Sequence, residues 1–210
     1  AYLQDLSATL EAAGGGILTL PPGTWRHTFT ELGDGVFLVG CGPATVVKLK
    51  DGVALRTPTN GSPSGSYGLT TKSGVDHAGV FNLEYDGNYT GTADYANNMD
   101  TIFLDGVATP GQYKIAGIAI SRLNRGAEWV APNHFWIDNV YSHETVRSCF
   151  IFQMEDGRPG DPGYVHAGKL VAKNAAFDHW LYCSESTTIS IEQFHGMGYA
   201  RDGGMILSGG

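Results

Sequence analysis

Three segments in the second half of the chain carry residues suited to acid–base chemistry at similar positions. They are FWIDNVYSHETVRSCFIF (residues 135–152), GKLVAKNAAFDHWLYCS (168–184) and ISIEQFHGMGYARDGGMILS (189–208). Each has an alternating strand, a corner residue (Asn139, Asn174 or Gln193), a polar stretch and a short apolar closing strand. Repeated units of this size predict strands that stack as successive turns of a coil.

Alignment of the closing strands brings four such residues together. It places Asp178 and His179 level with Ser148–Cys149, and Arg147 and Asp202 one step earlier. Stacked strands lie about 4.8 Å apart, so these side chains would share one edge of a sheet. Two carboxylates and a histidine can supply the acid and the base that cleave a glycosidic bond, and an arginine can hold a sugar carboxylate.

The same aspartates have a purely structural alternative. Asp178 and Asp202 precede tight corners, where an aspartate bonds to nearby backbone amides without any catalytic role. A catalytic role requires both carboxyl groups to face a groove about 5–10 Å apart. The sequence leaves both alternatives open.

Aromatic and charged residues elsewhere are candidates for contacts with a sugar. Trp129 and Trp136 could stack on sugar rings, although in a coiled β structure they could equally fill the interior. Arg158 and Tyr164 belong to a long loop that could form the wall of a saccharide cleft or a solvated acidic surface. The acidic residues of this loop lack the spacing of an EF-hand, so calcium is possible but has no support in the sequence, and no metal ligands or cofactor are predicted.

The composition is that of an all-β protein. Of 210 residues, only 16% are charged, 11% are aromatic and 30 are glycine, about double the usual share. The net charge of −8 argues against a nucleic-acid partner, which requires a basic surface. No apolar stretch approaches the length that spans a membrane as a helix.

The chain is predicted to be a single domain over residues 1–210. Leu3, Leu6 and Leu10 form one apolar stripe, which predicts a helix over residues 2–13. Residues 1–16 would form a capping helix and a glycine hinge, and residues 17–210 a solenoid of short strands and corners. Two stretches interrupt this pattern, near residues 57–73 and 153–166, and are predicted to be long loops.

The first 90 residues carry motifs of a known family. GGGILTLPPGTW (14–25), GCGPATVVKL (40–49) and the tripeptide Asp86-Gly87-Asn88 follow the capping helix. In these motifs the chain resembles the pectin lyase-like superfamily, in the branch of tailspikes, polysaccharide depolymerases and pectate lyases. The resemblance implies a right-handed parallel β-helix in which Asp86-Gly87-Asn88 is a turn. Asp202-Gly203 is similar in placing to the catalytic aspartates of polygalacturonase-like members, whereas Asp178-His179 departs from it and the doubled aspartate is absent.

The resemblance also implies a class of function. We expect an extracellular or virion-associated protein that engages a polysaccharide, with activity as a polysaccharide lyase or glycoside hydrolase left open. The alternative is a non-catalytic fibre, filament or receptor-binding subunit. Because the sequence stops after an apolar strand with no second helix, we expect the last rung to be covered by further chain or by a partner, as in a homotrimer.

Overall fold

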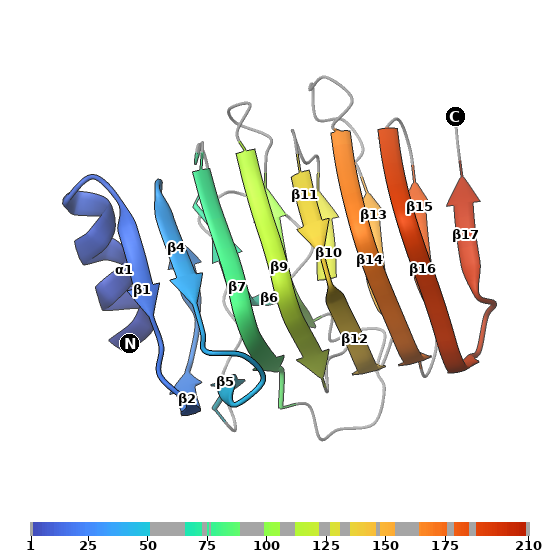
Figure 1. Cartoon of the computed structure of the whole chain (residues 1–210), viewed down its shortest axis with the longest axis horizontal. Helices are drawn as coiled ribbons and strands as arrows, with labels where there is room; N and C mark the ends of the chain where they lie inside the picture. Colours follow the sequence, from blue (N-terminus) through green and yellow to red (C-terminus); the bar gives the residue numbers. More distant parts are fainter. Residues whose placement is uncertain are drawn as a thin grey trace.

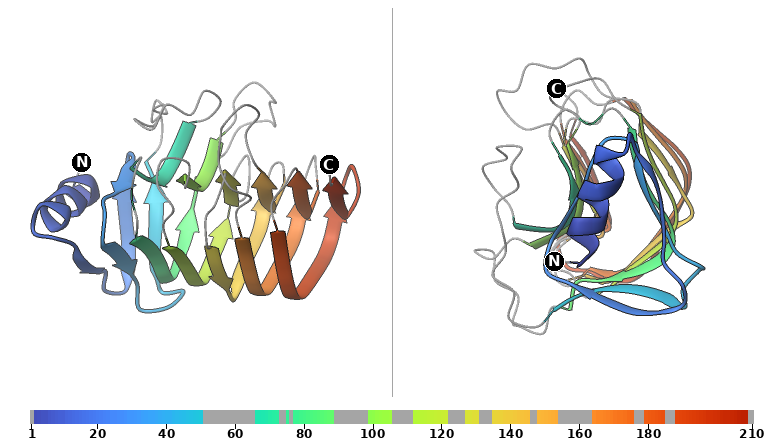
Figure 2. Two further views of the ribbon diagram at one scale, coloured as in Figure 1. Left: turned by 90° about the horizontal axis from the view of Figure 1, so that it is seen from above. Right: turned by 90° about the vertical axis from the view of Figure 1, so that its left-hand side faces the viewer.

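The chain is a right-handed parallel β-helix with a short helix at its N-terminal end, as the sequence predicts (Figure 1). This computed structural model describes residues 2–50, 66–72, 75, 77–88, 99–105, 112–121, 127–130, 135–145, 148–153, 164–175, 179–184 and 188–208. All the strand pairs assigned among these residues are parallel. The strands lie side by side along the long axis, so residues far apart in sequence become neighbours on successive rungs (Figure 2).

The larger sheet has ten strands and curls around one side of the coil. Its central path runs β1-β4-β7-β9-β11-β14-β12, with β2 and β5 joined through β7 and with β16 beside β14. The strands are β1 (Gly16–Thr19), β2 (Gly23–His27), β4 (Val36–Val39), β5 (Thr45–Leu49), β7 (His77–Asp86), β9 (Gln112–Ser121), β11 (Phe135–Asp138), β12 (Val140–Thr145), β14 (Tyr164–Ala175) and β16 (Thr188–Ala200).

The smaller sheet has seven strands in the order β17-β15-β13-β10-β8-β6-β3. They are β3 (Thr30–Leu32), β6 (Ser66–Thr71), β8 (Met99–Asp105), β10 (Ala127–Val130), β13 (Phe150–Gln153), β15 (Leu181–Ser184) and β17 (Met205–Ser208). Strand β6 lies inside the stretch predicted as a loop over residues 57–73, so that prediction is wrong for Ser66–Thr71. Residues 57–65 lie outside the described part, as do residues 154–163 of the second predicted loop.

Asparagine residues form corners where the larger sheet bends. Asn82 and Asn139 have φ of 50° and 53°, and each follows a residue in register with Ala116. Asn174 (φ of 56°) and Glu144 (φ of 53°) form a second corner on neighbouring rungs, where the Asn174 amide donates a 2.8 Å hydrogen bond to the Glu144 carboxylate. Asparagine tolerates this left-handed conformation better than most residues. The corner roles predicted for Asn139 and Asn174 are therefore confirmed, whereas the corner predicted at Gln193 is wrong, because Gln193 lies within β16 in register with Lys169.

Side chains alternate between the interior of the coil and its outer surface. In β5, Val47 and Leu49 are buried, whereas Val46 and Lys48 lie on the outer surface. The inward side chains of successive rungs form one continuous apolar core. At the last described rung, Met205 and Leu207 continue the inward positions of Leu181 and Cys183 but are 47% and 69% exposed.

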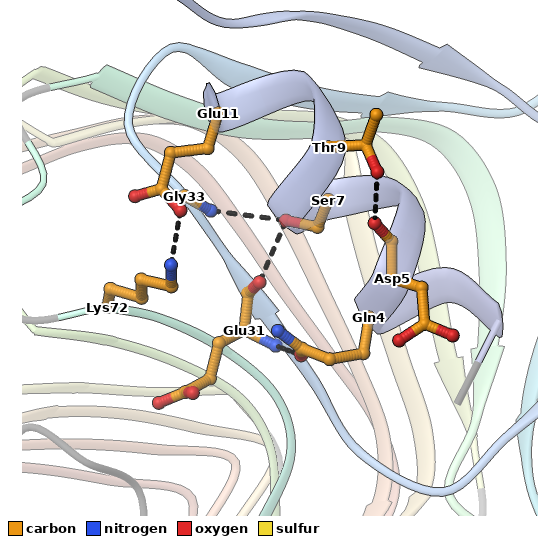
Figure 3. A network of polar contacts seen from close by, with 8 residues as sticks. All are labelled: Gln4, Asp5, Ser7, Thr9, Glu11, Glu31, Gly33 and Lys72. Atoms are coloured by element: carbon orange, nitrogen blue, oxygen red, sulfur yellow. Dashed lines mark hydrogen bonds and ion pairs between the residues drawn. The ribbon is translucent and has the colours of Figure 1, made fainter. Parts of the chain in front are cut away.

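The N-terminal end of the core is covered by helix α1 (Tyr2–Ala12), close to the predicted range 2–13. The helix lies against β3, the edge strand of the smaller sheet. The backbone of β3 pairs with helix side chains as it would with a strand: Glu31 N donates to Gln4 Oε1 at 2.6 Å, and Ser7 Oγ donates to Glu31 O at 2.8 Å (Figure 3).

Two further contacts hold the helix in place. Gly33 N donates to Ser7 Oγ at 3.2 Å, so this one hydroxyl both donates and accepts. Lys72 forms an ion pair with Glu11, which joins the end of the helix to the second rung of the smaller sheet. The cap therefore satisfies an open strand edge as well as covering apolar residues.

Candidate functional site

The acid–base group predicted at the edge of the smaller sheet is only partly described. Arg147, Asp178 and Arg158 lie outside the described residues, so their predicted roles stay predictions. The alignment that joined the group is wrong by one residue. Phe150 is in register with Leu181 and Met205, which places His179 level with Ser148 instead of Cys149. The equal lengths of the apolar closing strands concealed this shift.

His179 and Asp202 lie in different surroundings. Both ring nitrogens of His179 are buried and have no hydrogen-bond partner within the described part of the chain, and its ring stands edge-on to Tyr182 at 6.0 Å. Asp202 lies on an exposed turn between β16 and β17. The joint action of His179 and Asp202 stays a prediction, and so does the corner alternative for Asp202.

The three aromatic candidates lie in strands. Trp129 is in register with Phe152, which is buried, and Trp136 is in register with His166, which is partly exposed. Tyr164 begins β14 and is in register with Thr188, so its predicted place in the long loop is wrong. The side chains of the three candidates lie outside the described part, so their contact with sugar stays a prediction.

A different set of polar residues shares one register position on the larger sheet. Strand register joins Lys48 to Asp86, Asp86 to Ser121, Ser121 to His143 and His143 to Lys173. These five residues, here called the polar row, come from β5, β7, β9, β12 and β14. Because each rung contributes one residue, the row runs along the axis of the coil with a repeat of about 4.8 Å.

One end of the polar row is held by an ion pair. Lys48 Nζ lies 2.7 Å from Asp86 Oδ2, and the two side chains are 17% and 11% exposed. The other carboxylate oxygen of Asp86 accepts a 2.8 Å hydrogen bond from Asn88 N, in the turn that Asp86-Gly87-Asn88 was predicted to form. Both oxygens of Asp86 are therefore engaged, and this carboxylate is poorly suited to act as a base.

The other end of the polar row holds His143, a residue that can act as a base. The half-buried ring of His143 stacks on Tyr141 with 4.7 Å between centroids and 17° between planes. Burial lowers the pKa of His143 below 6.5 and Lys173 lowers it further, against the opposing effects of Glu84, Glu144 and Asp86. A histidine with a lowered pKa is neutral at neutral pH, and its free imidazole nitrogen can accept a proton.

Sequence reasoning missed the polar row because it considered the histidines one at a time. His143 stands alone in the sequence, with no histidine near enough to form a recognisable motif, and Asp86 was predicted only as part of a turn. A usable signal was present: LEYDGN, VYSHET and LVAKNA each place a polar residue directly before a glycine, glutamate or asparagine corner. Alignment of these opening strands, instead of the closing strands, would have placed Asp86, His143 and Lys173 at one position.

The described residues also bear on a metal site and on a membrane-spanning helix. Within the described residues, no group of three or more histidine, cysteine, aspartate or glutamate side chains is placed to hold a metal ion. No helix of the described chain has the length and apolar character needed to cross a membrane.

Comparison with known proteins gives weak similarity. No protein-family model and no curated protein matches the sequence. Among solved structures, the chain is similar to the A-module of mannuronan C-5 epimerase AlgE4 from Azotobacter vinelandii, with 17% identity over 91% of this chain and 71% of that chain and a TM-score of 0.47. The AlgE6 A-module of the same organism is 17% identical over 99% of this chain and 70% of that chain, with a TM-score of 0.46. The β-helix described above rests on the strand pairing of the chain itself.

Proposed function

We propose that this β-helix binds an acidic polysaccharide along the polar row and cleaves it by elimination. The observation that carries the proposal is the row itself, which places one polar residue on each rung of the outer surface. An extended polysaccharide repeats at a distance similar to the spacing of the rungs, so successive sugars can meet successive residues of the row. Lys173 supplies a cation for a sugar carboxylate.

The chemistry follows from the neighbours of His143. Neutralisation of a uronate carboxylate by Lys173 makes the adjacent carbon–hydrogen bond more acidic. His143 then takes the proton from that carbon, the carbon–oxygen bond to the next sugar breaks, and the electron pair of the C–H bond forms the new double bond. We assign Tyr141, stacked on His143, as the donor of a proton to the leaving oxygen. Hydrolysis would need two available carboxylates, and the carboxylate of Asp86 is engaged.

A matched pair of lysines tests binding. Lys173→Met is expected to weaken binding to acidic polysaccharides at least tenfold, measured by calorimetry or retention on a glycan array. Lys169→Met removes the same charge from an exposed position of the same strand and should leave binding within about twofold. Equal effects of the two substitutions would mean that overall charge, and not the polar row, governs binding.

Product formation separates an enzyme from a binding module. His143→Gln should keep binding and lower the formation of unsaturated uronate, followed by ultraviolet absorbance, by about 10²–10⁴-fold. A second candidate function is a fibre subunit in which the polar row is a rigid binding surface. It is favoured by Asp86, because both of its carboxylate oxygens are engaged by Lys48 and by Asn88 N. Binding that depends on Lys173 without product from any acidic polysaccharide would establish that candidate.

The pH dependence of activity gives an independent test of the base. A base acts when deprotonated, so activity should rise with pH through the pKa of His143 in the free protein. Because burial and Lys173 lower that pKa, the acid limb of kcat/KM should have its midpoint below 6.5. A midpoint above 6.5 would exclude a role as the base for His143 in this environment.

The expected location and assembly are also part of the proposal. A protein that acts on a polysaccharide would work outside a cell or on a virion surface, in the manner of a tailspike. Met205 and Leu207, exposed at inward positions of the last described rung, form an apolar surface that further chain or a partner, as in a homotrimer, would cover. Analytical ultracentrifugation tests this point, and a monomer of 22.4 kDa throughout the micromolar range would exclude a stable homotrimer.

A further inference from the structure

The interior of the first three rungs holds a cluster of polar side chains in an otherwise apolar core. His27 ends β2 and is 1% exposed, Thr30 begins β3 and is 2% exposed, and Tyr85 lies in β7 and is fully buried. His27 Nδ1 lies 3.1 Å from Thr30 Oγ1, and its Nε2 lies 3.1 Å from the Tyr85 hydroxyl. The rings of His27 and Tyr85 meet edge to face with 5.5 Å between centroids.

The cluster links three rungs and both sheets. Register places β5 between β2 and β7, so the Tyr85 side chain reaches past Leu49 to meet His27. On the other side, a Cβ added to Gly68 of β6 would lie only 1.9 Å from the Tyr85 hydroxyl, which shows how closely Tyr85 approaches the smaller sheet. Thr30 directly precedes Glu31, whose backbone binds Gln4 and Ser7 of the cap.

We propose that His27 is a proton sensor whose protonation loosens the N-terminal cap and the first rungs in mildly acidic solution. In the closed state a neutral imidazole, with one donor and one acceptor nitrogen, is satisfied by two hydroxyl groups. A proton on the second nitrogen places a positive charge in a buried site, where it is costly. Opening of the first rungs exposes His27 to water, and acid therefore favours the open state.

The neighbouring charges do not compensate such a proton. The groups that bind His27 are the neutral hydroxyls of Thr30 and Tyr85, and Leu49 is its neighbour in register on β5. Two acidic residues come next along these strands. Glu31 follows Thr30 and binds the cap through its backbone, and Asp86 follows Tyr85 and is paired with Lys48 on the outer surface. Burial lowers the pKa of His27 to about 4, and the amino-terminal charge has a smaller effect in the same direction.

The size of the response follows from linkage. The folded pKa is lowered, so stability present above the unfolded value of 6.5 is lost as pH falls toward about 4. At pH 5 the protonated form of an exposed histidine is about thirtyfold more populated than the neutral form, whereas His27 in the closed state is mostly neutral. The population with open first rungs should therefore rise about twentyfold between pH 7 and pH 5.

Hydrogen exchange at the cap tests the proposal. After correction for intrinsic exchange rates, protection of the Glu31 and Gly33 amides should fall about twentyfold from pH 7 to pH 5, while the amides of β15 keep theirs. His27→Gln, which retains a donor and an acceptor but does not titrate here, should remove this pH dependence. His77→Gln, an exposed histidine at the start of β7, should leave it unchanged.

The overturning results are specific. Equal protection at pH 7 and pH 5 in the natural sequence, the same acid response in His27→Gln, or an equal loss of protection in β15 would each reject a local sensor at His27. If His27→Gln does not fold, titration of the His27 ring by NMR in the natural sequence decides the matter. A midpoint near 4 supports the proposal, and one near 6.5 overturns it.

Discussion

At the scale of single residues, the described C-terminal rungs depend on how the Trp180 ring is seated. The ring contacts two glycines on the last described rung, and its Nε1 donates a 3.2 Å hydrogen bond to Tyr199 O. A Cβ added to Gly196 would lie 2.2 Å from the ring, whereas one added to Gly204 would lie 3.2 Å away. The ring therefore leaves no space for a side chain at position 196, whereas a methyl group at position 204 would meet it only at close contact distance.

This difference predicts unequal effects of the same substitution. Gly196→Ala should displace the Trp180 ring and lower the free energy of unfolding by about 1–3 kcal/mol, the usual cost of overpacking. Gly204→Ala, beside the same ring, should cost less than about 1 kcal/mol. Urea denaturation followed by tryptophan fluorescence measures both. Equal costs would show that the ring moves freely and does not order this end of the core.

The residue scale is also where sequence reasoning reached its limit. Alternation and glycine corners are local signals, and they predicted the strands and the corner roles of Asn139 and Asn174. A functional site in a coil depends instead on register between rungs, and a slip of one residue moves a side chain to another position. The apolar closing strands fit equally well in two registers, which misplaced His179, and His143 could be recognised only beside Asp86 and Lys173.

At the scale of elements, the cap shows how a helix can end a parallel sheet. The spacing of Leu3, Leu6 and Leu10 predicted the helix but not its polar contacts, because the buried Ser7 lies within the apolar face. Its hydroxyl donates to Glu31 O and accepts from Gly33 N. A hydroxyl in an apolar stripe would ordinarily be expected to weaken packing, whereas here it completes the edge of β3.

We therefore expect Ser7→Ala to be costly for its size. The substitution leaves two buried backbone groups of the smaller sheet without partners, which should lower the free energy of unfolding by about 1–3 kcal/mol. Thr9→Ala is the control, because the Thr9 hydroxyl is exposed and binds only Asp5 O of its own helix. Thermal or urea denaturation compares the variants. A Ser7→Ala variant as stable as Thr9→Ala would mean that water replaces the lost contacts.

At the scale of the whole molecule, a coil whose rungs contact only their neighbours should open from its ends. The three cysteines report on this behaviour. Cys41 is exposed near the first rungs, whereas Cys149 and Cys183 are buried on successive rungs toward the C-terminal end. Burial raises the pKa of Cys149, and it raises that of Cys183 to about 12, so neither thiol should react in the closed state.

The expected order of thiol labelling is Cys41, then Cys183, then Cys149. Exposure of Cys183 requires only the last rung to open, whereas Cys149 lies one rung deeper, so its labelling rate should rise more steeply with urea concentration. Cys41→Ser should remove the fast phase and leave the two slow phases unchanged. Mild acid should open the N-terminal rungs through His27, at the opposite end of the coil. It should therefore not speed either slow phase beyond the effect of pH on the reagent. Identical urea dependence for Cys149 and Cys183 would show that the coil opens as one cooperative unit, and end-wise opening would then be wrong for this β-helix.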